Sequence, residues 1–219
     1  MTTTLQQTIN RVKGLVKDDS DKLDDPIDYY DAIETALTSY SQLRPRLASQ
    51  DIMTDANGEV VCASINDFDE AYLGLLQIEY PINTSGYRNL LDSEDVESYV
   101  APSGRRLRMV IAANVTARIH YYTFHALPRD VDDNPNPAGL LTVRASDIPA
   151  LCWLAASNAL QMLSNYYKNT ADKSTGADFV AFTTKSQEYA KGARDMKQKF
   201  DNHIEAGRGL VPQAQIVRG

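Results

Sequence analysis

Apolar residues recur at alternating steps of three and four near the C-terminal end of the chain, and this repeat narrows the possible folds sharply. The series contains Phe179, Phe182, Ser186, Tyr189, Ala193, Met196, Phe200 and His203 with Ile204. It is a heptad-like seam, which predicts one long helix that packs along a neighbouring helix. The partner helix can belong to the same chain or to another subunit, and the spacing alone does not decide between them.

A second long helix is predicted before this seam, with a polar turn at 169–176 between the two. Ser146 or Asp147 can act as its N-cap, and Pro149 fits its first turn. The broad apolar face of this helix predicts that it is deeply buried. The face consists of Ile148, Leu151, Cys152, Ala155, Ala159, Leu160 and Leu163.

The N-terminal part of the chain predicts a helical hairpin. Thr4 and Gln7 have the spacing of a capping box at the start of the first helix. An acidic, solvated link should follow that helix. The second helix is expected to begin with Asp25 as N-cap and Pro26 as its first residue, and to end before Pro45.

The middle of the chain has the patterns of β-structure. A turn signal at 57–58 precedes the strand-like segment 59–63. Segments 107–111 and 117–124 both alternate at period two and carry β-branched and aromatic residues. With residues 113–114 near the bend, they predict an antiparallel hairpin.

Together these elements predict a mainly α fold. It would be a helical bundle, made of the N-terminal hairpin and the two long C-terminal helices, with an antiparallel β region inserted at about 57–126. Residues 1–206 are expected to form a single domain, because 219 residues suit one domain better than two.

Residues 207–219 are expected to form an extended C-terminal arm, since Gly207 and Gly209 can end the last helix. The arm is too short to form its own core, and its apolar side chains would be poorly placed in plain solvent. We therefore predict that it docks on a partner, with a frayed tail as the alternative. The candidate partner-binding residues are Leu210, Val211, Pro212, Ile216, Val217 and Arg218.

Charge and cysteine usage exclude several classes of protein. The formal net charge is −7, and the longest basic run is Arg105-Arg106 with Arg108 nearby, so tight binding of nucleic acid is not expected. The two cysteines, Cys62 and Cys152, are too few for a disulfide framework or a cysteine zinc site. Without a signal peptide or an apolar span in the sequence, we expect a soluble protein made in the cytoplasm.

No motif in the sequence predicts an enzyme, a cofactor or a bound metal. A nucleophile elbow, a phosphate-binding loop and a His-Glu-x-x-His helix are all missing. On an extended strand His120 and His125 would point to opposite faces, so they could not share a metal. The acidic run 130–134 begins like a calcium loop but then meets Pro135 and Pro137.

Four segments, in this order, resemble a known family. Residues 32–41 leading into 44–46 resemble the N-terminal helix of head–tail adaptor (connector, or neck) proteins of tailed bacteriophages. Residues 76–81 are similar to the apolar-Glu-Tyr-Pro element of such proteins. Residues 121–127, followed by 147–151 at the start of an alanine-rich helix, are similar as well.

The resemblance implies a structural virion protein. Members of the family form a ring, usually dodecameric, beneath the portal protein at one capsid vertex. On this sequence the arm 207–219 would bind the portal, and the opposite face of the ring would receive a stopper or tail-side neck protein. DNA would pass through the lumen without specific binding. The alternatives are a tail-completion or other neck protein, or a cellular helical scaffold or regulatory protein.

Overall fold

The structure is a computed structural model that describes residues 3–18, 21–66, 75–82, 89–102, 104–109, 111 and 113–208. The chain divides into two compact units. The helical unit contains the described residues up to Arg44 and those from His125 onward. The β unit lies between Pro45 and Phe124. Each unit has its own hydrophobic core.

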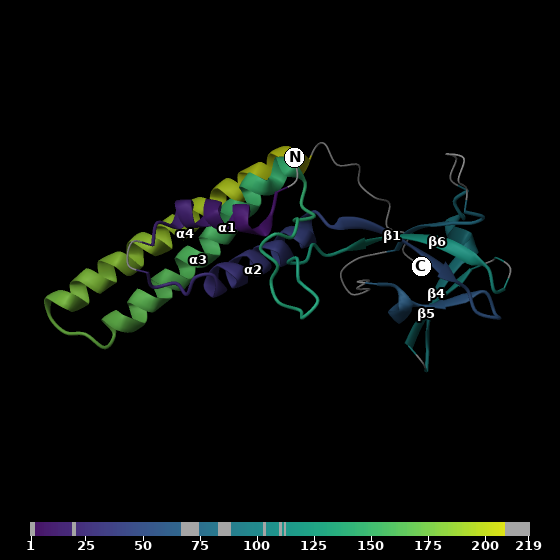
Figure 1. The fold of residues 1–219 in the computed structure, drawn as a ribbon, viewed down its shortest axis with the longest axis horizontal. Coiled ribbons are helices and arrows are strands. Elements are labelled where there is room, and N and C mark those ends of the chain that lie inside the picture. Colours follow the sequence, from purple (N-terminus) through teal and green to yellow (C-terminus); the bar gives the residue numbers. More distant parts are fainter. Residues whose placement is uncertain are drawn as a thin grey trace. The chain divides into compact units, whose positions relative to one another are not determined.

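The described part of the helical unit contains four α-helices: α1 (Leu5–Val16), α2 (Ile27–Leu43), α3 (Ile148–Ala171) and α4 (Ala177–Arg208). Helix α3 is the central element, because it packs against each of the other three (Figure 1). A short 3₁₀ turn, Ala145–Asp147, leads into it. Cys152 lies on α3 and is buried in this core, as expected, and burial raises the pKa of its thiol to about 11.

The seam of α4 packs against α3 of the same chain. Small residues allow the two helices to approach closely: Ser157 donates a hydrogen bond to the carbonyl of Ala193 at 2.8 Å, and Ser164 donates one to the carbonyl of Ser186 at 2.9 Å. Phe200 is among the most deeply buried side chains of the unit. The alternative of a partner helix from another subunit is therefore not needed along this part of α4.

The N-terminal caps agree with the sequence only in part. The capping box between Thr4 and Gln7 is present at the start of α1. Helix α2 begins at Ile27, so Pro26 is the N-cap residue and not the first helical residue. Asp25 forms an ion pair with Lys13 and does not cap the helix. The carboxylate of Asp28 reaches back to accept the backbone N–H of Asp24 at 2.7 Å.

Gly14 offers a test of helix α1, because it is exposed and a Cβ at this position would meet no atom within 4 Å. Gly14→Ala should raise the free energy of unfolding by about 0.5–1 kcal/mol, since alanine loses less backbone entropy in a helix. Gly176→Ala is the matched control. Its backbone has a φ of +66°, so alanine there should cost about 1–2 kcal/mol. Urea unfolding of both variants measures the two changes.

The β unit contains six described strands: β1 (Arg46–Met53), β2 (Glu59–Val61), β3 (Leu75–Glu79), β4 (Val96–Ala101), β5 (Gly104–Met109) and β6 (Thr116–Thr123). They form two antiparallel sheets, with strand orders β1-β6-β3 and β2-β5-β4. Two 3₁₀ turns, Cys62–Ser64 and Ser93–Asp95, connect strands. The core between the sheets consists of Val60, Cys62, Ile65, Ile78, Leu107, Met109, Ala117, Ile119 and Tyr121.

The predicted hairpin between 107–111 and 117–124 is wrong. Both segments are strands, but β5 pairs with β2 and β4, whereas β6 pairs with β1 and β3. Thr54 and Asp55 explain the difference, because they bond the backbone of Val115 and Asn114 and so continue the β1–β6 ladder toward β2–β5. Strands β5 and β6 therefore belong to different sheets.

The prediction of a mainly α fold with a helical bundle is also wrong. Helices, including the 3₁₀ turns, account for 50% of the described residues and strands for 21%, which makes this an α+β protein. The strands begin at Arg46, well before position 57, and they build a unit with its own core. Strands β1, β3 and β4 were not among the predicted strands, and the apolar residues of β1 and β4 do not alternate.

Candidate functional site

The predicted portal-binding residues lie outside the described part of the chain. These are Leu210, Val211, Pro212, Ile216, Val217 and Arg218. Helix α4 runs through Gly207 to Arg208, so Gly207 does not end the helix as expected. The segment 209–219 follows α4 directly in the sequence. The last residues of α4 are therefore its nearest described neighbours along the chain.

Asp147 is the centre of a buried polar cluster in the helical unit. Its carboxylate is almost fully buried and accepts hydrogen bonds from Tyr40 Oη at 2.6 Å and Arg44 Nη1 at 2.8 Å. It also accepts from Ser146 Oγ at 3.1 Å and His203 Nε2 at 3.2 Å. Three helices thus contribute to one buried carboxylate.

The role of Asp147 differs from the expected helix cap. It occupies the N-cap position of α3, yet its side chain makes no capping hydrogen bond. Burial acts to raise the pKa of Asp147, but hydrogen bonds from Tyr40 and His203 and the charge of Arg44 outweigh it and lower the pKa below its usual value. Burial, together with the hydrogen bond to Asp147, raises the pKa of Tyr40. Asp147 is therefore a permanent negative charge at neutral pH.

His125 holds the point where the chain returns to the helical unit. Its backbone N–H donates to Ser41 Oγ at 2.8 Å, and its Nε2 lies 3.1 Å from the carbonyl oxygen of Arg44. A carbonyl oxygen can only accept, so Nε2 carries the proton in this contact and Nδ1 is available to accept from Thr142 Oγ1 at 2.8 Å. The end of α2 and the loop residue Thr142 thus form the hydrogen-bonding environment of this histidine.

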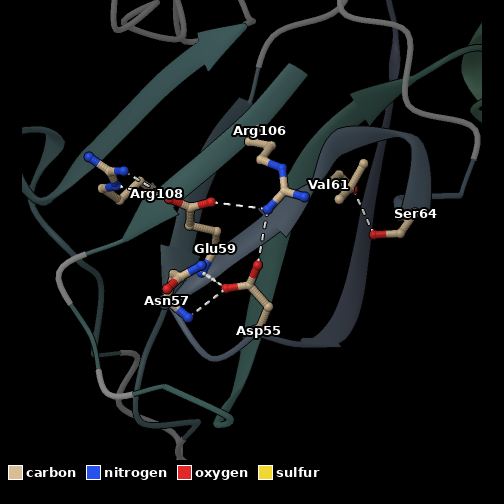
Figure 2. Close-up of polar contacts among 7 residues, drawn as sticks. All are labelled: Asp55, Asn57, Glu59, Val61, Ser64, Arg106 and Arg108. Carbon is tan, nitrogen blue, oxygen red and sulfur yellow. Dashed lines mark hydrogen bonds and ion pairs between the residues drawn. The ribbon is translucent and has the colours of Figure 1, made fainter. Parts of the chain in front are cut away.

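Glu59 is the centre of a second polar cluster, on β2 and β5 of the β unit (Figure 2). The residue is only 4% exposed, and Arg108 Nη2 donates to it at 2.9 Å while Arg106 Nη1 donates at 3.1 Å. Arg106 also binds Asp55 at 3.0 Å. Because Glu59 and Arg108 are paired positions on neighbouring strands, the ion pair is part of the sheet register.

The charges around Glu59 keep it ionised. The hydrogen bond from Tyr99 is the largest influence on the pKa of Glu59; burial opposes it, and the bonds from Arg108 and Arg106 help to hold the pKa below its usual value. A lowered pKa contributes stability that is present above the unfolded value of 4.5 and is lost as the pH falls through the folded value.

Glu59→Gln should therefore destabilise the β unit at neutral pH, because two arginines lose the carboxylate that pairs with them. Hydrogen exchange of the β2 and β5 amides should become faster. Below pH 4.5 the exchange of the wild type, corrected for intrinsic rates, should approach that of the variant. Glu97→Gln is the matched control, because Glu97 pairs with the same Arg108 at 3.8 Å but is exposed. Equal effects of the two variants would contradict the structural role of Glu59.

The histidines and the acidic loop that were considered as metal ligands do not come together in one site. His120 lies on β6, buried beside Glu79, with Nε2 and Oε2 3.4 Å apart. His125 lies beyond the end of β6, in the helical unit. In the acidic loop, the carboxylate of Asp130 accepts the backbone N–H groups of Asp132 and Asn134. Within the described residues, no three side chains of metal-ligating types are gathered together.

Apolar side chains are exposed at the free end of the α3–α4 hairpin. Phe179 is 44% exposed, Val180 62% and Tyr166 44%. Asn158 on α3 donates to the carbonyl of Ala32 on α2, which begins five residues earlier. The last two turns or so of α3 therefore extend beyond the start of α2 (Figure 1). These exposed residues lie on that extension of the hairpin.

Comparison with models of known protein families gives no match to this chain, and comparison with curated proteins gives none either. The described helices do not include one with the length and apolar character of a membrane span.

Proposed function

We propose that the chain is a structural subunit of a bacteriophage neck, a head–tail adaptor that binds the portal protein as a ring. It presents the docking surface for a stopper or tail-side neck protein while DNA passes through the lumen. It acts by binding and does not catalyse a reaction. The segment with Leu210, Val211, Pro212, Ile216, Val217 and Arg218 is the part that contacts the portal.

The observation that carries the assembly role is the exposure of apolar residues at the end of the α3–α4 hairpin. Phe179 belongs to the same seam that is buried against α3 further along α4. At the hairpin end Phe179 is 44% exposed, and Val180 and Tyr166 are exposed on the same extension of the hairpin. An exposed apolar surface of this kind is typical of a contact with another protein.

The polar clusters support the same role, because their hydrogen bonds are directed inward. The four donors around Asp147 belong to the ends of the helices that it joins. Glu59 is enclosed by arginines of its own sheet. Buried carboxylates that are fully hydrogen-bonded within their own unit make each unit more rigid, which favours docking to a partner.

The assignment to a bacteriophage neck rests on the four sequence segments that resemble adaptor proteins. Residues 32–41 lie in the C-terminal part of α2, and residues 147–151 form the N-cap and the first residues of α3. The net charge of −7 is compatible with a lumen through which DNA moves without sticking. Closed cyclic symmetry would repeat one contact surface around the ring.

Electron microscopy of the purified protein mixed with the portal protein of the same genome tests the proposal. We expect a ring stacked on the portal, with density for the C-terminal segment on the portal surface. A chain that ends at Gly209 is the matched control and should fold normally but fail to dock. A protein that stays monomeric and does not bind the portal would overturn the proposal and favour a cellular scaffold.

A further inference from the structure

Strand β1 lies at the edge of its sheet and has one free side. The sheet has the order β1-β6-β3, so among the described strands β1 has a neighbour only on the β6 side. The N–H of Thr54 donates to the carbonyl of Val115 at 2.9 Å and continues the β1–β6 ladder. Because hydrogen-bonded positions alternate along an antiparallel ladder, the even-numbered residues of β1 bond to β6. The odd-numbered residues therefore direct their N–H and C=O groups to the free side.

The side chains of these odd-numbered residues are exposed on the outer face of the sheet. The two at the ends are apolar, with Leu47 54% exposed and Met53 67% exposed. Ser49 and Asp51 lie between them. The carboxylate of Asp51 is paired at both oxygens by Arg118, at 2.6 and 2.9 Å. The free side of β1 thus has exposed apolar ends and a polar centre whose charge is balanced.

The other outer strands of the two sheets are covered or shorter. On the outer side of β3, the N–H of Leu91 donates to the carbonyl of Ile78 at 2.8 Å, and the N–H of Tyr80 donates to the carbonyl of Asn89 at 2.9 Å. Strand β2 has three residues and β4 has six, whereas β1 has eight. A long exposed edge pairs readily with a strand of another chain, and native proteins normally cover such an edge. Of the described edges, β1 is the one best suited to bind another strand.

We propose that β1 pairs with β1 of a second copy of this chain, antiparallel and about a two-fold axis at Gln50. The odd-numbered residues supply the hydrogen bonds on both strands, so Leu47 lies opposite Met53 of the second copy. Ser49 likewise lies opposite Asp51 of the second copy. Apolar side chains then meet at both ends of the pair, and at its centre the hydroxyl of Ser49 donates to the carboxylate of Asp51.

The residue pattern of β1 selects this register. A slide by two residues in one direction places Asp51 opposite Asp51 of the second copy, and like charges directly opposite destabilise a pair. A slide in the other direction places Leu47 opposite Asp51, so an apolar side chain meets a carboxylate. Of these three registers, only the one centred at Gln50 pairs apolar with apolar and polar with polar. It also overlaps nearly the full length of both strands.

The pair goes beyond the proposed ring. A two-fold contact uses the same surface on both copies and closes with two of them, so it cannot be the contact that repeats around a ring. The pairing of β1 is therefore a property of the free protein, before it meets the portal. Its formation covers the exposed edge and removes Leu47 and Met53 of both copies from water.

Sedimentation of the full chain without the portal tests the pairing. We expect a dimer with a Kd of about 1–100 µM, because an edge contact is small. Met53→Lys places a charge at both ends of the pair and should raise the Kd at least about tenfold. Val100→Lys is the matched control, since Val100 is 74% exposed on the edge strand β4, and it should leave the Kd unchanged. Unchanged hydrogen exchange of the β6 amides shows that both variants are folded.

Cysteine cross-linking tests the register. Leu47→Cys chains mixed with Met53→Cys chains should form a disulfide under mild oxidation, because opposite Cα atoms at hydrogen-bonded positions are about 5.5 Å apart. Leu47→Cys mixed with Val100→Cys should not link, and the natural Cys62 and Cys152 are buried. A chain that is monomeric at about 100 µM, or a dimer that Met53→Lys does not weaken, would overturn the inference. Equal linking in both mixtures would overturn the register. Portal binding plays no part in these measurements, so their failure is distinct from failure of the proposed function.

Discussion

Asp147→Asn is expected to lower the free energy of unfolding of the helical unit by about 3 kcal/mol. The amide cannot neutralise Arg44, whose side chain is only 12% exposed. It also offers one acceptor oxygen where the carboxylate offers two, so the hydroxyl of Tyr40 and the imidazole of His203 compete for it. The single tryptophan, Trp153, lies on α3 beside His203, and its fluorescence during urea unfolding reports on this unit.

The effect of Asp147 should depend on pH in one direction. Because its pKa lies below the usual value of 3.8, Asp147 contributes stability that is present above that value and is lost as the pH falls through the folded value. The wild type should therefore lose stability on acidification below that value, and the Asn variant should lose less.

Asp201→Asn is the matched control for the same experiment. Asp201 pairs with Lys197 on the surface of α4, and the substitution should change the free energy of unfolding by no more than about 0.5 kcal/mol. Similar losses for Asp147→Asn and Asp201→Asn would show that burial gives Asp147 no special role.

The helices could be predicted from the sequence because their signals are local. A capping box, a seam with a regular step and a broad apolar face each lie within one element, and the structure confirms α1, α3 and α4 near the expected places. The environment of Asp147 could not be predicted in this way. Tyr40 is 107 positions away, and an aspartate two positions before a proline has the local pattern of a helix cap.

Several strands could not be predicted, because their sequences lack a local signal. In β1 the apolar residues Leu47 and Met53 are exposed, whereas Arg46 and Gln50 occupy the half-buried positions. The alternation of burial is therefore not an alternation of hydrophobicity, and the strand had no period-two signal. The connection from β4 to β5 did carry a local signal, because the proline and glycine at 102 and 104 are typical turn residues. Its use would have paired β5 with β4.

Phe200→Ala is expected to destabilise the helical unit by about 3–4 kcal/mol. The side chain is only 1% exposed in the core that all four helices share, so the substitution leaves a cavity in it. Urea unfolding followed by Trp153 fluorescence measures the loss. Phe179→Ala is the matched control, since it removes the same side chain from the same seam at a position that is 44% exposed.

Phe179→Ala should cost less than about 1 kcal/mol of folding stability, because little apolar surface returns to water. If the exposed end of the seam is used for assembly, this variant should instead reduce ring formation on the portal, which Phe200→Ala would affect only by unfolding the chain. A large loss of stability from Phe179→Ala in the isolated protein would mean that the seam is covered there without a partner. The hairpin end would then not be an assembly surface, whereas the packing of Phe200 in the core would be unaffected.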